Sequence, residues 1–175
     1  METLDRNYSY SPLLSDDGTD TDAFAAPTSL TAAELAAAEG VLSFVGKDFV
    51  PRFLRLTVKG LRSSADNEAA KIRIFARRLD KATGKYLPET LLTLTATLGT
   101  LENGTSSDGS APAYMADTLA VVAEESYLDE SQYQIVSPAD NTVASIVLDM
   151  QGSSAIEIQA IVDTCTYVNV LAAYI

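Results

Sequence analysis

The sequence predicts an all-β protein: an antiparallel β-sandwich, jelly-roll-like, of about eight strands, with an extended N-terminal arm and one short helix. Three observations predict this fold. Apolar and polar residues alternate in many segments after residue 40, polar turns separate these segments, and no long helical pattern lies between them. Residues 1–40 are expected to form the arm with its helix, and residues 41–175 the sandwich.

The N-terminal segment is polar and acidic. The stretch SDDGTDTD at residues 15–22 offers nothing to bury, and Pro12 and Pro27 flank it. A segment of this composition cannot offset the entropy lost on ordering, so residues 1–28 are expected to be an extended arm.

A short helix is predicted after the arm. In LTAAELAAAEG, Thr31 and Glu34 have the spacing of a capping box, the alanines favour helix, and Gly40 stands where a C′ glycine would. The pattern predicts about eight helical residues, too few to be stable unless they pack on another part of the fold.

Alternation with a period of two defines the first three predicted strands, in RFLRLTVKG, KIRIFARRLD and ETLLTLTATLGTL. The positions expected to face the core are Leu54, Leu56, Val58, Ile72, Ile74, Ala76, Leu92, Leu94, Ala96 and Leu98. The positions expected to face outward are Arg55, Thr57, Lys59, Lys71, Arg73, Phe75, Arg77, Thr93, Thr95 and Thr97. The polar stretches SSADNE, DKATGK and ENGTSSDGSAP are expected to be turns and loops.

Five further strands are predicted in the rest of the chain. They lie near residues 116–126, 131–137, 142–150, 154–161 and 166–175. Gly152 is expected in the turn between the third and fourth of these. The last strand, VNVLAAYI, is so apolar that we expect it inside the fold or in a subunit contact.

Charge is distributed very unevenly along the chain. Residues 1–46 carry one cation and eight acids, and residues 86–175 carry twelve acids and no cation. Residues 47–85 hold eleven of the twelve cations against four acids, so this segment is positive in a chain whose net charge is −12. Such segregation produces a local field opposite in sign to that of the whole molecule.

Two interpretations of the basic segment stay open. Its cations could pair with acids on neighbouring strands of the same molecule. Alternatively, they could form one face that meets an acidic surface on another subunit or a partner protein. The residues assigned to that predicted interface are Arg52, Arg55, Lys59, Lys71, Arg73 and Arg77. Nucleic acid is not an expected partner, because a −12 chain repels phosphate.

The sequence points to no catalytic residue, cofactor or metal site, and we expect a protein that is not an enzyme. Histidine is absent, and Cys165 is the only cysteine and is expected to be a buried apolar residue. The adjacent acids Glu124–Glu125 and Asp129–Glu130 could serve a glycosidase, but they are better explained as solvated turns. The acidic stretch 15–22 lacks the spacing of a calcium-binding EF-hand loop.

Membrane insertion and secretion are also not expected. No apolar run has the roughly 20 residues of a membrane helix, and the first residues lack the pattern of a signal peptide.

The run ASIVLDMQGSSAIEIQAIVDTCTYVNVLAAYI, the acidic arm and the compact body over about residues 41–175 resemble the cement or decoration proteins of tailed-bacteriophage heads. The resemblance is one of architecture. It implies a virion protein, made in the host cytoplasm, that binds the outside of the capsid shell and stabilises it by bridging subunits. The implied partners are the major capsid protein or other virion proteins, and further copies of the chain, often as a trimer. The arm would reach onto adjacent subunits.

One alternative function stays open. Carbohydrate- or receptor-binding modules of virions and bacterial surfaces share this architecture, and some of the eight tyrosines could stack on a sugar, although tryptophan is absent. The arm hypothesis also makes a prediction: deleting residues 1–28 should leave the body folded and weaken assembly.

Overall fold

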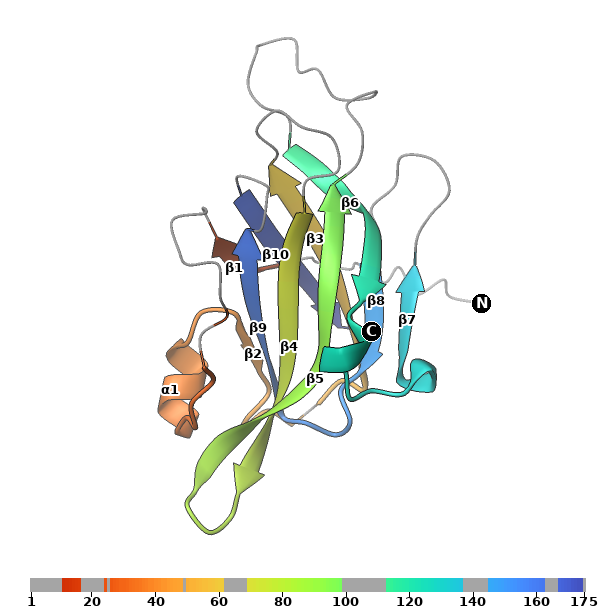
Figure 1. The fold of residues 1–175 in the computed structure, drawn as a ribbon. Coiled ribbons are helices and arrows are strands. Elements are labelled where there is room, and N and C mark those ends of the chain that lie inside the picture. The colour runs from red at the N-terminus through yellow and green to blue at the C-terminus, as the bar shows by residue number, and fades with distance from the viewer. Residues whose placement is uncertain are drawn as a thin grey trace, which may run out of the picture.

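Two antiparallel sheets pack face to face as a β-sandwich, with one short helix on an outer face (Figure 1). The computed structural model describes residues 11–16, 24, 26–48, 50–61, 69–98, 113–136, 145–162 and 167–174. The strands are β1 (Ser11–Asp16), β2 (Val41–Ser43), β3 (Phe53–Leu61), β4 (Ala69–Asp80), β5 (Lys85–Leu98), β6 (Ala113–Val121), β7 (Tyr133–Val136), β8 (Ser145–Asp149), β9 (Ala155–Val162) and β10 (Tyr167–Tyr174). The helices are α1 (Ala32–Ala37) and the 3₁₀ turns η2 (Ala123–Glu125) and η3 (Glu130–Gln132).

The first sheet has the order β1-β10-β3-β8-β7, and the second has the order β2-β9-β4-β5. Strand β6 connects the two sheets, because it pairs with β3 at one end and with β5 over the rest of its length. The predicted all-β sandwich is therefore confirmed, and its eight predicted strands correspond to β3–β10. Two strands were missed: the short β2, and β1, which lies within the predicted arm and pairs with β10.

The core lies between the sheets and contains the predicted inward positions that the structure describes. They are Leu54, Leu56, Val58, Ile72, Ile74, Ala76, Leu92, Leu94 and Ala96, all buried. Leu98 belongs to β5, but its side chain lies outside the described part. The C-terminal strand β10 runs inside the first sheet between β1 and β3, with Val170 and Ala172 buried, which confirms the expectation for the apolar tail.

Four predicted outward positions are buried instead: Thr57, Phe75, Arg77 and Thr93. Thr57 lies between its ladder partners Ser145 and Leu171 in the first sheet. The other three lie on the outer face of the second sheet, which is covered in part by other segments of the chain. Period-two alternation indicates which side of a sheet a residue faces, but not whether something covers that side.

Helix α1 is one such cover. The predicted capping box is present: the Glu34 N–H donates to Thr31 Oγ1 at 3.3 Å, and the Thr31 N–H donates to Glu34 Oε2 at 2.8 Å. The helix packs through Leu35, which forms a second small cluster with Tyr86 and Ala155. This packing supplies the stabilisation that a helix of six residues lacks by itself.

The end of the helix differs from the prediction. Helix α1 has six residues and its C-cap is Ala38, so Gly40 lies two positions beyond the cap, not at C′. Gly40 has a φ of +71°, and its carbonyl accepts the Ile158 N–H at 2.8 Å. The glycine therefore turns the chain into β2.

The predicted turn DKATGK joins β4 to β5. The Asp80 carboxylate accepts from the Ala82 N–H at 2.9 Å and from Thr83 Oγ1 at 2.6 Å, and Gly84 adopts a φ of +69°. The predicted turn at Gly152 is also confirmed: Gln151 and Gly152 both have positive φ, and the turn carries the chain from β8 in the first sheet to β9 in the second.

A β-bulge at Leu91 bends the second sheet. Ile74 pairs with Leu92 and Phe75 pairs with Thr90, which leaves Leu91 as the extra residue. Its carbonyl accepts the N–H groups of Tyr127 and Leu128 at 2.8 and 3.2 Å. Bulges increase local twist, and beyond this one β4 and β5 continue as a twisted hairpin below the sandwich (Figure 1).

Candidate functional site

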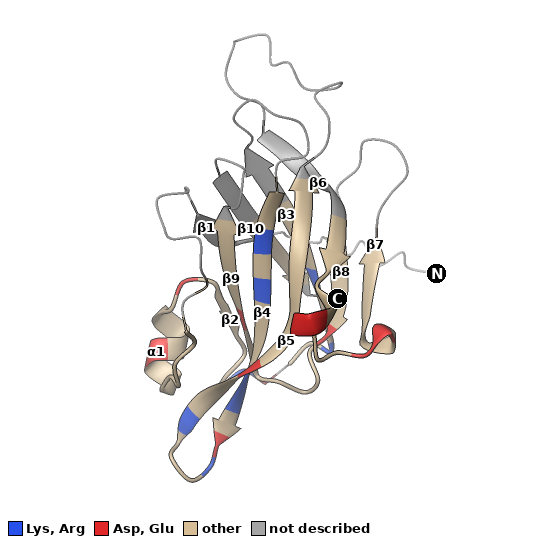
Figure 2. Cartoon of the chain, in the orientation of Figure 1, with Lys and Arg blue, Asp and Glu red and all other residues tan. Residues whose placement is uncertain are grey.

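The six predicted interface residues do not lie on one face, so that part of the hypothesis is wrong. Arg52, Arg55 and Lys59 lie in or beside β3 of the first sheet, whereas Lys71, Arg73 and Arg77 lie on β4 of the second. Figure 2 shows basic positions in blue along β4. The intervening residues of both strands fill the same core. The outward residues of β3 and β4 must therefore point to opposite sides of the sandwich.

The cations near β3 contact polar groups of β8. Arg52 Nε lies 3.2 Å from Asp149 Oδ2, and its guanidinium lies 4.9 Å from the centre of the Phe53 ring. Arg55 Nε donates to Ser145 Oγ at 2.9 Å. For Lys59 the structure describes the backbone, paired with Asn169 and Met115, and not the side chain.

Arg77 of β4 is buried, with an exposed fraction of 1%. Its Nε and Nη2 groups donate to Glu157 Oε2 on β9, and its Nη1 group donates to the Thr28 carbonyl. The residue therefore joins β4, β9 and the segment that precedes α1. It cannot meet an outside partner without leaving these contacts.

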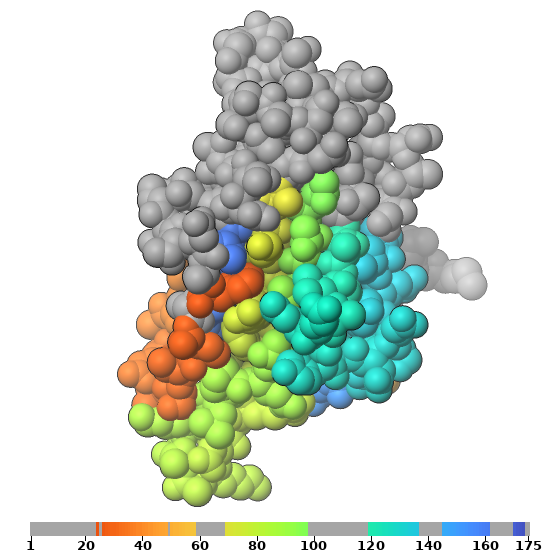
Figure 3. Space-filling view, in the orientation of Figure 1, coloured from red at the N-terminus to blue at the C-terminus, as the bar shows by residue number. Residues whose placement is uncertain are grey.

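We call residues 26–37 the strap. It crosses the outer face of the second sheet. Thr28 contacts Arg77, and Leu30 pairs with Tyr86 through two backbone hydrogen bonds. Leu35 of α1 is buried against Tyr86 and Ala155. Figure 3 shows the strap on one side of β4 and β5, and the segment that contains η2 on the other. Together they explain why outward residues of these strands are buried.

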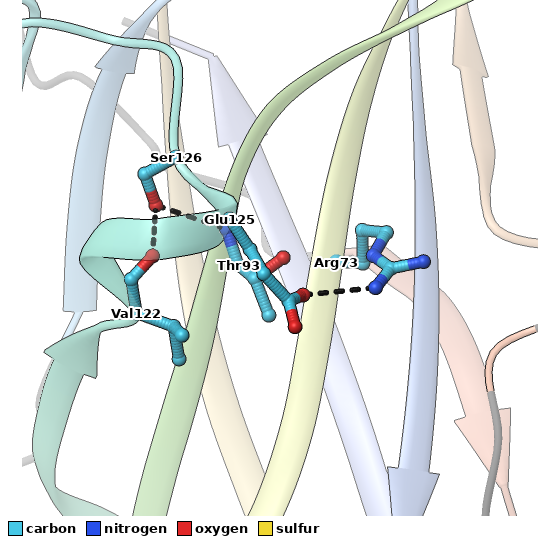
Figure 4. A network of polar contacts seen from close by, with 5 residues as sticks. All are labelled: Arg73, Thr93, Val122, Glu125 and Ser126. Carbon is cyan, nitrogen blue, oxygen red and sulfur yellow. Dashed lines mark hydrogen bonds and ion pairs between the residues drawn. The ribbon is translucent and has the colours of Figure 1, made fainter.

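Arg73 lies between these two covers and forms the candidate site. Its Nη2 group donates to Glu125 Oε2 on η2 at 2.8 Å (Figure 4), and its guanidinium lies 4.3 Å from the centre of the Phe24 ring. Thr93 is its ladder partner on β5, and Gln159 is its partner on β9. The three side chains therefore form a polar row across three strands.

Two atoms of this row have no hydrogen-bond partner although they are buried. They are Thr93 Oγ1, in a residue that is 2% exposed, and Gln159 Oε1. Thr93 is held in place by its backbone: its carbonyl accepts the Val122 N–H at 2.9 Å, and its N–H donates to Ser126 Oγ at 3.4 Å (Figure 4). Buried polar atoms are normally satisfied, so this row offers hydrogen bonds to water or to a polar ligand.

The hydrogen bond from Arg73 is the main cause that lowers the pKa of Glu125 below its ordinary value of 4.5. The Thr93 hydroxyl and the charges of Arg73 and Lys71 act in the same direction, although no hydrogen bond of normal geometry joins Thr93 Oγ1 to the carboxylate. Glu125 is thus held ionised as the counterion of Arg73. The pKa values of Glu34 and Asp80 are lowered by the hydrogen bonds of the helix cap and the β4–β5 turn.

The other acidic residues considered for catalysis lie in exposed turns or cap a short helix. Glu124 is exposed on η2, and Glu130 is exposed in the first turn of η3. Asp129 caps η3 in a capping box with Gln132. These residues thus form the exposed turns expected for them.

Other predictions lie partly or wholly outside the described residues. Cys165 is among them, as is the acidic stretch 15–22 apart from the strand residues Ser15 and Asp16. Within the described ranges, no group of three Cys, Asp or Glu side chains could hold a metal ion. None of the helices described there is both long and apolar enough to cross a membrane.

The sequence analysis did not identify the residues that contact the arginines of β4. Glu157 is the single acid in the apolar strand AIEIQAIV, and an isolated acid in a strand next to a basic one is the signal that could have found it. No sequence pattern predicts the contacts of Phe24 and of the Thr28 carbonyl. Every residue has a backbone oxygen, and a single aromatic residue in a polar segment shows no periodicity.

Comparison with models of known families, with curated proteins and with solved structures found no match in any of the three.

Proposed function

We propose that the chain is a non-enzymatic structural protein of a bacteriophage virion, a cement or decoration protein that binds the outer capsid shell and bridges its subunits. The observation that supports this function most is that the N-terminal region contacts both sheets. Strand β1 pairs with β10 in the first sheet, and the strap contacts β4 and β5 in the second. A sandwich braced in this way is a rigid body suited to holding other subunits in place.

The internal ion pairs support the same role. Arg52, Arg73, Arg77 and Arg78 each pair with an acid of this chain that is distant in sequence or on a neighbouring strand. They hold segments of the frame together, as the intramolecular interpretation of the basic segment expected. Among the six predicted interface residues, Arg52 and Lys71 remain exposed enough to meet a capsid protein as well.

Copies of a rigid body on a symmetric shell would gain affinity by multivalency, so each contact can be weak by itself. In this proposal the partners are the major capsid protein and further copies of the chain, and the location is the outside of the virion.

Co-sedimentation tests the proposal. Purified protein should sediment with empty heads of the phage that encodes it, and intact virions should contain the chain by mass spectrometry. The double variant Arg52→Glu, Lys71→Glu should be released at a lower salt concentration than wild type, because surface charge pairs are screened by salt. Lys47→Glu is the matched control, since Lys47 is exposed but is not one of the six predicted interface residues. A chain that is absent from virions and from the head pellet would rule the proposal out.

A second candidate function is a carbohydrate-binding module, and one observation favours it. Tyr127, 76% exposed, follows the η2 segment that covers the polar row of Arg73, Thr93 and Gln159. An exposed aromatic ring is a surface on which a sugar can stack. Binding on a glycan array that is lost in Tyr127→Ala would establish it. An array without signal would dismiss it.

A further inference from the structure

The β4–β5 hairpin projects from the sandwich as an isolated ribbon (Figures 1 and 3). The ladder of β4 with β9 ends at Arg77, and β6 pairs with β5 only from Leu94 onward. Apart from the bridge between Leu30 and Tyr86, residues 78–87 therefore pair only with one another among the described residues.

Two leucines are exposed on this ribbon. Leu79 is 49% exposed and Leu87 is 45% exposed. Leu79 lies opposite Tyr86, and Leu87 lies opposite Arg78, so the leucines emerge on opposite faces of the ribbon. The face that carries Leu79 is the side on which Tyr86 packs against α1, so Leu87 is the leucine on the freer face. An exposed apolar side chain on a projecting hairpin favours contact with a partner.

The hairpin is held rigidly at its tip and at its base. At the tip, the Asp80 carboxylate accepts two hydrogen bonds within the turn. At the base, Tyr86 is buried against α1, and Arg78 pairs with Glu89 and donates to the Gln151 carbonyl at 3.2 Å. A preformed element loses little conformational entropy on binding, which favours association.

The tip is also cationic, unlike most of the molecule. Lys81 and Lys85 are exposed, and neither forms an ion pair with the described acids. In a chain whose net charge is −12, two copies repel each other over most of their surface. The lysine-bearing tip is a place where one copy can approach an acidic surface of another.

A complementary surface lies at residues 124–130. Tyr127 is the most exposed large apolar side chain described, and Glu124, Asp129 and Glu130 are exposed beside it in the sequence. The backbone of this segment is fixed by the hydrogen bonds of Tyr127 and Leu128 to the bulged Leu91. The segment thus combines an aromatic ring with carboxylates, where the hairpin combines leucines with ammonium groups.

We propose that the β4–β5 hairpin of one copy docks on residues 124–130 of a second copy. Leu87, on the face of the ribbon away from Tyr86 and α1, contacts Tyr127, and Lys81 and Lys85 face the carboxylates of that segment. The two surfaces differ, so the contact is heterologous and joins copies head to tail into a ring or an open chain. The proposed contact between copies deepens the proposed function. It rests on that function only for the expectation that the chain assembles.

The contact is small. Standard interfaces bury about 800 Å² per partner, and a hairpin tip with a short segment provides less, so we expect micromolar or weaker affinity for a single contact. Closure of a ring would raise the overall stability, because each copy then makes two contacts.

Sedimentation velocity over a wide range of protein concentration tests the inference. Wild type should self-associate, and more weakly at high salt. Leu79→Ser with Leu87→Ser, and separately Tyr127→Ser, should each weaken association by at least about tenfold. All three positions are exposed, so an unchanged thermal midpoint is expected, and Val50→Ser, at another exposed apolar position, is the matched control.

A charge exchange makes the test specific. Lys81→Glu with Lys85→Glu should abolish most of the association, as should Glu124→Lys with Glu130→Lys. The chain that carries all four changes should associate again to within about threefold of wild type, because the charges are then exchanged between the same surfaces. A wild type that stays monomeric, or a four-residue variant that stays as weak as its parents, overturns the inference. Co-sedimentation of that monomeric protein with heads would leave the proposed function standing, so the two failures are distinguishable.

Discussion

Arg77 of β4 and Glu157 of β9, eighty residues apart in the sequence, form a buried ion pair on the outer face of the second sheet. Arg77 is 1% exposed and Glu157 is 9% exposed, and Arg77 also donates to the Thr28 carbonyl of the strap. Part of the positive charge of β4 therefore binds the N-terminal region of the same chain. This pair is the first of four features that can be tested by substitution, titration or truncation.

Removal of Arg77 should destabilise the fold strongly. Arg77→Ala leaves Glu157 as an unpaired buried charge and is expected to lower the free energy of unfolding by about 3–5 kcal/mol, measured by urea denaturation. The matched control is Arg78→Ala, which breaks the exposed pair with Glu89 and should cost less than about 1 kcal/mol. Equal costs for the two variants would contradict the structural role of the buried pair. The double variant Arg77→Met, Glu157→Met should recover much of the loss, since no charge is left buried.

The capping box of α1 should contribute to stability through the strap. Thr31→Ala removes the side-chain oxygen that accepts the Glu34 N–H, and we expect a loss of about 1 kcal/mol in the free energy of unfolding. Thr31→Ser keeps that oxygen and should behave as wild type. If the alanine and serine variants melt together, the cap does not support the packing of Leu35 on Tyr86.

The pair of Glu125 with Arg73 should make stability depend on pH in the acidic range. The pKa of Glu125 is lower in the folded protein than its ordinary value of 4.5, so the unfolded chain binds the proton more readily. The contribution of this pair is therefore fully present above the unfolded pKa and is lost as the pH falls through the folded pKa. The free energy of unfolding of Glu125→Gln should show a shallower decline than that of wild type as the pH falls below about 5.

Glu124→Gln is the control for that titration, because Glu124 is a neighbour on η2 that forms no ion pair with the described cations. Its profile should follow wild type. Parallel profiles for all three proteins would show that Arg73 does not hold the Glu125 carboxylate in solution.

Truncation of the N-terminal region separates two expectations. The composition of residues 1–28 predicts that the body folds without them. The structure predicts a cost, because the deletion removes the Thr28 acceptor of Arg77 and strips β1 from the edge of β10. We expect a lower thermal midpoint and more aggregation from the exposed edge.

Deletion of residues 1–10 alone is the matched truncation, since it leaves every described contact in place. Its midpoint should equal that of wild type. A chain without residues 1–28 that melts at the same temperature would show that β1 and the Thr28 acceptor add nothing to stability.

The polarity pattern of the sequence was sufficient for the fold class and for most of the core. Alternation of apolar and polar residues is a local property, and it placed the eight strands β3–β10 and the buried faces of β3, β4 and β5. The turn at Asp80–Lys85 and the capping box at Thr31 were predictable for the same reason, because their signals lie within a few residues. Strand β2 escaped because three residues cannot establish a period.

The sequence by itself therefore determined the strands, the turns, the helix cap and the concentration of charge between residues 47 and 85. Only the tertiary structure decided where that charge goes. Arg77 meets Glu157 and Thr28, and Arg73 meets Glu125 and Phe24, across separations of about fifty residues or more. Such pairings arise because strand order brings distant segments together and the strap covers one outer face, and no local pattern along the chain records either event.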